Sequence, residues 1–150
     1  MDNQQVISTI NELIETCRDG EMEFRICAQN VHDNEIKSML TELAQHCAES
    51  ATELQNEVRR LGGDPDTHGS VSGTLYRGWL NVKSAITGKD EAAVLAECER
   101  GEDIAVRRYE DALAQDLPGE IRSVIERQYQ GVLANHDVVR NLRDRARDHA

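Results

Sequence analysis

The stretch CRDGE at residues 17–21 returns as CERGE at residues 98–102, and LAQH at residues 43–46 returns as LANH at residues 133–136. Helical bundles build metal sites in their cores from a Glu on each of two helices and a His on each of the other two. The recurrence therefore predicts a metal site made of Glu21, His46, Glu102 and His136. Repeats as short as these also arise by chance in helical proteins rich in Ala, Glu and Arg, so a chance origin without a metal site stays open.

Apolar residues around these stretches recur in steps of three and four, which is the spacing of helices packed against neighbours. In the first half of the chain they predict a helix over residues 2–31, which starts with a capping box of Asp2 and Gln5. They predict a second helix over residues 34–61, which ends at Gly62.

The segment that follows, residues 62–89, opens with GGDPDTHGSVSG and does not continue as a long helix. Helical spacing around Trp79 predicts a short extra helix within this connector. Two more long helices are predicted over residues 90–115 and 118–147, the last with Pro118 in its first turn. No strand pattern is present, so the predicted fold class is all-α.

Connection lengths select the order of the four helices. Two tight turns create two antiparallel hairpins, whereas the long connector is able to run the length of the bundle before the third helix starts. This predicts a single domain over residues 1–150, a ferritin-like four-helix bundle with one long crossover. The sequence midpoint of Glu21 and His46 falls in the first turn and that of Glu102 and His136 in the second. All four candidate residues are therefore expected near mid-height.

Charge and composition restrict the classes of partner. The 28 acidic residues against 17 basic ones give a net charge of -11, which repels nucleic acid and acidic membrane surfaces. No apolar run approaches the roughly 20 residues of a membrane helix, so a cytoplasmic protein is expected. A chain of 150 residues buries a sizeable core without disulfides or metals. A bound ion would therefore serve function rather than folding.

Four cysteines occur without any CxxC pair, and each lies inside a predicted helix. They are Cys17, Cys27, Cys47 and Cys98. This spacing is typical of reduced, buried thiols rather than of a zinc knuckle or a secreted disulfide framework. A role as metal ligand stays open for Cys17, Cys47 and Cys98, which are close in sequence to the candidate residues.

Several segments together resemble a bacterial family of uncharacterised ferritin-like four-helix-bundle proteins, over nearly the whole chain. They are DGEMEFR at 19–25, ELAQHCAES at 42–50, RGWLNVKSAITGKD at 77–90 and ERGEDIAVRRYEDAL at 99–113. GEMEFR is also similar to the Gly-Glu-x-x-x-Arg of rubrerythrins. In the metal-binding relatives a Glu-x-x-His motif recurs on the second and fourth helices. The two histidines match, but Leu43 and Leu133 stand where the carboxylates that bridge two irons are expected.

The resemblance and its departure imply one divalent ion, such as zinc, manganese or iron, instead of a dinuclear centre. Catalysis is not predicted. The alternative is a metal-free helical scaffold or stress-associated interaction protein, which binds no cofactor and forms homo-oligomers through a helix face. An oxygen- or peroxide-reactive metalloenzyme is a third interpretation, and the missing bridging carboxylates argue against it.

Overall fold

The computed structural model describes residues 1–67, 69 and 91–148. These residues form four long helices and no strand, so the all-α prediction is confirmed for the part of the chain that is described. The helices are α1 (Asn3–Gln29), α2 (Asn34–Arg60), α4 (Glu91–Leu113) and α5 (Gly119–Asp148). None of them has an apolar stretch long enough to cross a membrane. The extra helix predicted around Trp79 lies outside the described residues.

The ends of the helices follow from local sequence. Asp2 and Gln5 form the predicted capping box: the Gln5 backbone N–H donates to Asp2 Oδ1 at 2.8 Å, and the Asp2 N–H donates to Gln5 Oε1 at 2.9 Å. Asp33 caps α2 by accepting from the Ile36 N–H at 3.0 Å. Gly62 follows α2 with a φ of 80°, a left-handed conformation that glycine adopts without strain.

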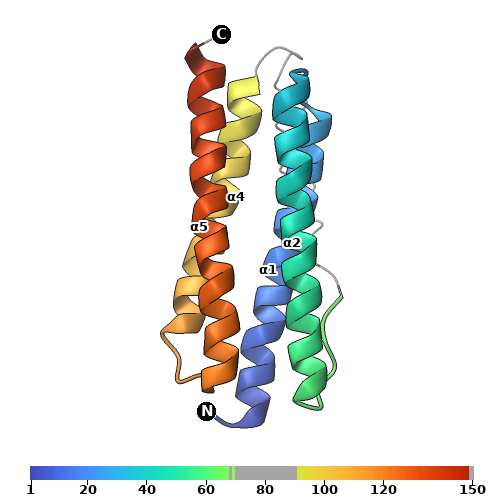
Figure 1. Ribbon diagram of the computed structural model, residues 1–150, viewed down its shortest axis with the longest axis vertical. Coiled ribbons are helices and arrows are strands. Elements are labelled where there is room, and N and C mark those ends of the chain that lie inside the picture. Colours follow the sequence, from blue (N-terminus) through green and yellow to red (C-terminus); the bar gives the residue numbers. More distant parts are fainter. Residues whose placement is uncertain (68, 70–90, 149–150) are drawn as a thin grey trace.

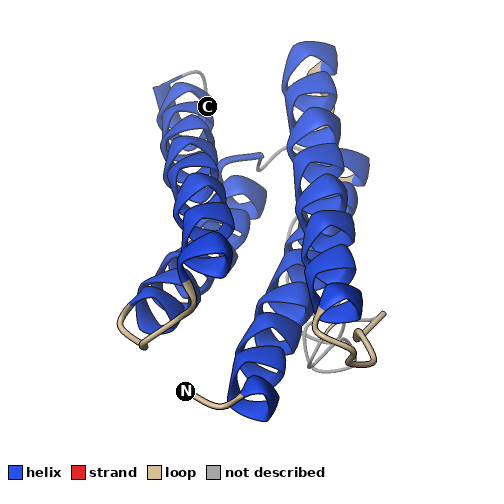
Figure 2. Ribbon diagram, turned by 60° about the horizontal axis from the view of Figure 1, so that its bottom comes forward, coloured by secondary structure: helices blue, strands red, loops and turns tan. Residues whose placement is uncertain are grey.

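The chain runs up through α1, down through α2, down again through α4 and up through α5 (Figure 1). Because α2 and α4 run in the same direction, α4 begins at the opposite end of the bundle from the end of α2. This is the predicted single-crossover, ferritin-like order, and the structure confirms it. Figure 2 shows the two hairpins as separate pairs of helices. Between the pairs, α1 packs against α4, whereas α2 and α5 make only slight contact.

The apolar core is divided into two clusters, one toward each end of the bundle. The first, the Phe24 cluster, contains Phe24, Cys27, Ala28, Val31, Ile36, Leu40, Leu43, Ala44, Val94, Leu95, Cys98, Val139 and Leu142. The second, the Ile10 cluster, contains Val6, Ile10, Leu13, Ile14, Cys17, Ala51, Leu54, Val58, Tyr109, Ala112, Leu117, Ile121 and Ile125. The buried residues between them along α1, α4 and α5 are Gly20, Glu23, Glu102, Ala105 and Gln128, here called the central layer. The bundle therefore carries buried polar groups at the height where the sequence predicted a site.

Candidate functional site

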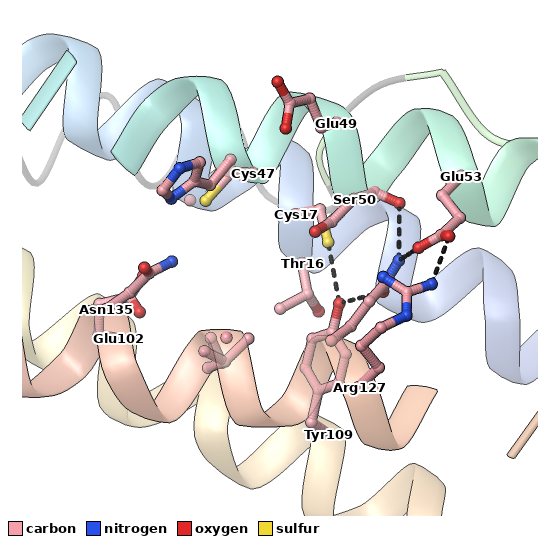
Figure 3. A pocket seen from close by; sticks show the side chains of 16 residues that line it. Thr16, Cys17, Cys47, Glu49, Ser50, Glu53, Glu102, Tyr109, Arg127 and Asn135 are labelled. Carbon is pink, nitrogen blue, oxygen red and sulfur yellow. Dashed lines mark hydrogen bonds and ion pairs between the residues drawn. The ribbon is translucent and has the colours of Figure 1, made fainter. Parts of the chain in front are cut away.

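A cavity of about 420 Å³ lies at the level of the central layer and is lined by all four helices (Figure 3). Its fully exposed lining residues belong to α2 and α5, so it opens to solvent between these two helices. The mouth is formed by His46, Glu49, Arg127 and Gly131. The remaining wall is formed by Thr16, Cys17, Gly20, Cys47, Ser50, Glu53, Glu102, Ala105, Tyr109, Gln128, Val132 and Asn135. The cavity is thus found where packing between the hairpins is weakest.

A chain of hydrogen bonds runs along one end of the cavity and joins α1, α4 and α5 (Figure 3). The Tyr109 hydroxyl lies 3.1 Å from Cys17 Sγ and donates to Gln128 Oε1 at 2.9 Å. Burial raises the pKa of the Cys17 thiol to about 12, so this thiol stays protonated at neutral pH. Cys17 therefore takes part as a hydrogen-bonding group and not as a reactive thiolate.

The same chain continues to α2, where it forms the polar link between α2 and α5. Gln128 Nε2 donates to Glu53 Oε1 at 2.7 Å and to the Ser50 carbonyl at 3.3 Å, and Arg127 pairs with the same Glu53 carboxylate. Burial acts to raise the pKa of Glu53, but the hydrogen bonds from Arg127 and Gln128 outweigh it and lower the pKa below its usual value. Glu53 is thus a carboxylate whose charge is already neutralised.

The Glu102 carboxyl differs from that of Glu53 because no described residue pairs with it. Its side chain is 3% exposed and lines the cavity, and within the described residues it makes no hydrogen bond or ion pair. Burial, with a smaller contribution from the charge of Asp103, raises the pKa of Glu102 to about 8. At neutral pH the carboxyl therefore holds its proton, and a positive charge placed beside it would favour ionisation.

Two glycines inside helices, Gly20 of α1 and Gly101 of α4, lie against side chains of other helices. A methyl group on Gly20 would lie 3.1 Å from Cys47 Sγ and 3.9 Å from Glu102 Oε1. A methyl group on Gly101 would overlap the carboxyl of Glu23. The missing side chain of Gly101 therefore leaves space for the Glu23 carboxyl of α1, and that of Gly20 leaves space for the Cys47 thiol of α2.

Glu23, which the sequence analysis did not consider, is therefore the glutamate that α1 contributes to the central layer. Burial, then repulsion from Glu102, raises the pKa of Glu23 to about 9. Its position could have been found from helical spacing, because it lies three residues after buried Gly20 and four before buried Cys27. Glu23 faces the contact with Gly101 and does not line the cavity.

Glu21, the α1 residue of the predicted site, is held on the flank of the helix. Its carboxylate accepts hydrogen bonds from Arg18 and Arg25, each at 2.9 Å, one turn before and one turn after it. Burial acts to raise the pKa of Glu21, but these two hydrogen bonds outweigh it and the pKa is lowered. Arginines three residues before and four after a glutamate are the sequence signal for such pairing.

The two predicted histidines also have different surroundings. His46 is exposed on α2 at the mouth of the cavity, whereas His136 Nε2 lies 2.5 Å from Asp103 Oδ1, away from it. Of the four predicted residues, the structure brings His46 and Glu102 to one cavity and leaves Glu21 and His136 with other partners. Within residues 1–67, 69 and 91–148, no three His, Cys, Asp or Glu side chains are grouped so that they could hold a metal ion.

The helix order and the layered core define a ferritin-like four-helix bundle. The chain belongs to the family described as "Domain of unknown function (DUF2383)", whose model matches residues 5–115. Its fold is similar to that of the Dps protein from Vibrio cholerae O1, described as a member of a broad superfamily of ferritin-like diiron-carboxylate proteins. The two share 16% identity and a TM-score of 0.70 over 93% of this chain and 89% of that one. No match is found among curated proteins.

A dinuclear carboxylate centre of the kind named for that superfamily does not fit the residues present. Leu43, which the sequence resemblance places where one bridging carboxylate is expected, is buried within the Phe24 cluster. The same resemblance places Leu133 at the other position, and Glu21 is paired with two arginines. The similarity to the Dps protein therefore establishes the fold of this chain and not its function.

Proposed function

We propose that this bundle binds a small cation in its central cavity, with Glu102 as the group that meets the positive charge. The carrying observation is the Glu102 carboxyl, which is buried on the cavity wall without a hydrogen bond or ion pair to any described residue. Leaving such a group unpaired is costly, and a cation beside it stabilises its ionised form. Binding at neutral pH is therefore expected to release the proton of Glu102.

The surroundings of the cavity favour a cation over an anion. Glu49 adds a second acid at the mouth, and the single positive group there, Arg127, is already paired with Glu53. The chain as a whole carries a net charge of -11, which raises the local concentration of cations. The net negative charge of the protein and the carboxyl of Glu102 thus both favour a cation in the cavity.

A single divalent transition metal ion, namely zinc, manganese or iron, is the cation that the sequence predicted. His46 on α2 and Glu102 on α4 line the same cavity, which supports these two as its protein ligands. Glu21 and His136 would first have to leave Arg18, Arg25 and Asp103. We therefore propose His46 and Glu102, rather than all four residues, as the groups that act in this cavity.

Metal binding to untagged protein tests this proposal. Titration calorimetry with zinc, manganese and ferrous salts, in two buffers of different protonation enthalpy, measures both affinity and proton release. We expect binding with release of a proton at pH 7, weakened at least about tenfold by Glu102→Gln. The matched variants Glu21→Gln and His136→Ala should change affinity less than about twofold. Loss of binding in these two variants would restore the four-residue site, and binding unaffected by Glu102→Gln would contradict the role of Glu102.

Self-association, the alternative prediction, has less support on the described surface. The large hydrophobic side chains that are exposed there are Met1 and Ile104, which do not form an apolar helix face. An oxygen- or peroxide-reactive centre would need the bridging carboxylates that Leu43 and Leu133 replace. Cation binding is accordingly the function that the cavity supports best.

A further inference from the structure

We infer that the natural ligand of the cavity is a small organic cation, a primary amine with a short aliphatic body whose ammonium group binds at Glu102. The inference rests on the proposed cation-binding function and names the class of ligand. Three features of the cavity carry it: its volume, the mixture of polar and apolar groups on its wall, and the kind of acceptors that it offers.

The volume suits a molecule rather than an ion. A cavity of about 420 Å³ lies within the range of roughly 300–1,000 Å³ that small-molecule sites occupy. A water molecule takes about 30 Å³ in the liquid, and a metal ion with two protein ligands would leave most of the cavity to solvent. An alkylamine of several carbon atoms occupies more of this space than a metal ion and displaces more of its water.

The wall combines the Glu102 carboxyl with apolar surface. Ala105, Val132 and the ring of Tyr109 supply apolar atoms in the same cavity as the Glu102 carboxyl. A hydrated metal ion gains nothing from apolar walls, whereas an aliphatic chain is favoured by burial against them. A ligand that is cationic at one end and apolar along its body matches both parts of the wall.

The available acceptors match an ammonium group better than a metal ion. An ammonium has three N–H donors and no acceptor, and neutral oxygens such as those of Thr16 and Asn135 on this wall serve it well. Cys17 Sγ lies 3.1 Å from the Tyr109 hydroxyl and is already engaged in that hydrogen bond. No described group of three or more metal-binding side chains converges there.

The experiment compares butylamine with 1-butanol, which has the same carbon chain without the charge, and with zinc chloride. Binding to the full chain is measured at pH 7 by calorimetry and by shifts of amide resonances around Gly20 and Glu102. We expect butylamine to bind at least about tenfold more tightly than 1-butanol and more tightly than zinc. Glu102→Gln should remove that preference over 1-butanol, while Glu21→Gln, the same change on the surface of α1, should retain it.

Each other outcome is decisive. Zinc binding that depends on Glu102, with no binding of butylamine, would overturn the amine inference and leave the proposed cation-binding function intact. Equal binding of 1-butanol and butylamine would show an apolar cavity without charge recognition and would overturn both. Failure of both butylamine and zinc to bind to folded protein, verified by its circular dichroism, would also overturn both.

Discussion

The two contacts between the hairpins are built differently, and the difference locates the site. Along the α1–α4 contact, Gly101 leaves space for the Glu23 carboxyl, which is enclosed there. Along the α2–α5 contact, packing is slight, and Gln128 and Arg127 reach across to Glu53 through polar bonds. The α1–α4 side of the bundle is closed by packing, whereas the α2–α5 side is joined by hydrogen bonds. The cavity that contains Glu102 therefore opens to solvent between α2 and α5.

The largest expected effect comes from removing a side chain of the closely packed core. Leu95→Ala removes a fully buried side chain of the Phe24 cluster, and we expect a loss of roughly 3 kcal/mol in the free energy of unfolding. Val132→Ala, in the half-buried wall between α2 and α5, should cost less than about 1 kcal/mol. Urea unfolding of both variants measures the difference. Equal losses would mean that the two contacts contribute alike.

The next effect concerns pH. Burial raises the pKa of Glu102 in the folded chain to about 8, so above the ordinary glutamate pKa the folded state holds more protons than the unfolded state. The stability present below that ordinary pKa is therefore lost as the pH rises toward about 8. Glu102→Gln removes this loss and should raise the free energy of unfolding at pH 8, with little change at pH 4.5. Chemical unfolding at the two pH values measures it, and a variant less stable at pH 8 would contradict the account.

Breaking the polar link between α2 and α5 should have a smaller effect on stability and a local effect on motion. Gln128→Ala leaves the Tyr109 hydroxyl without its acceptor and Glu53 without one of its two donors. We expect a loss of about 1–2 kcal/mol, because buried polar groups lose their partners. Hydrogen exchange should accelerate in α2 and α5 beside the cavity more than along the α1–α4 contact. Uniform acceleration would mean that the link does not specifically hold the α2–α5 side.

The smallest effect is expected at Glu21, and its sign with pH is the opposite of that at Glu102. Arg18 and Arg25 lower the pKa of Glu21, so its contribution is present above the usual glutamate pKa and is lost as the pH falls through the lowered value. Because the pairs are partly exposed, Glu21→Gln should cost no more than about 0.5 kcal/mol at pH 7. A loss above about 2 kcal/mol in thermal or urea unfolding would show that Glu21 has a buried role.

The fold could be predicted because its determinants are local. Apolar spacing gave the four helices, and the two short turns with one long connector gave the crossover order. The level of Glu102 along the bundle was also predictable, since residues equally far from a turn share a level. The direction of each side chain was not, because successive residues on a helix are rotated by about 100° and a shift of two residues changes the face.

Glu21 and Glu23 illustrate this limit. Both lie near mid-height on α1, yet Glu21 pairs with Arg18 and Arg25 while Glu23 is enclosed against Gly101. The recurrence of Gly-Glu drew attention to the residue after each glycine, which led to the cavity-lining Glu102 and missed Glu23. Glu102 could be found because it lies on the apolar face of its helix, four residues after Cys98. The buried face of Glu23 can be recognised only from its spacing to Gly20 and Cys27.

The protonation state of the Glu102 carboxyl is the property on which the proposed cation binding depends most. Its side-chain carbon resonance, followed by NMR as a function of pH with Glu102→Gln to assign the signal, reports the pKa directly. We predict a midpoint of about 8 in the free protein, and a lower midpoint when butylamine is added. A midpoint near 4.5 that the amine does not change would show that Glu102 is neither buried without a partner nor the group that meets a cation.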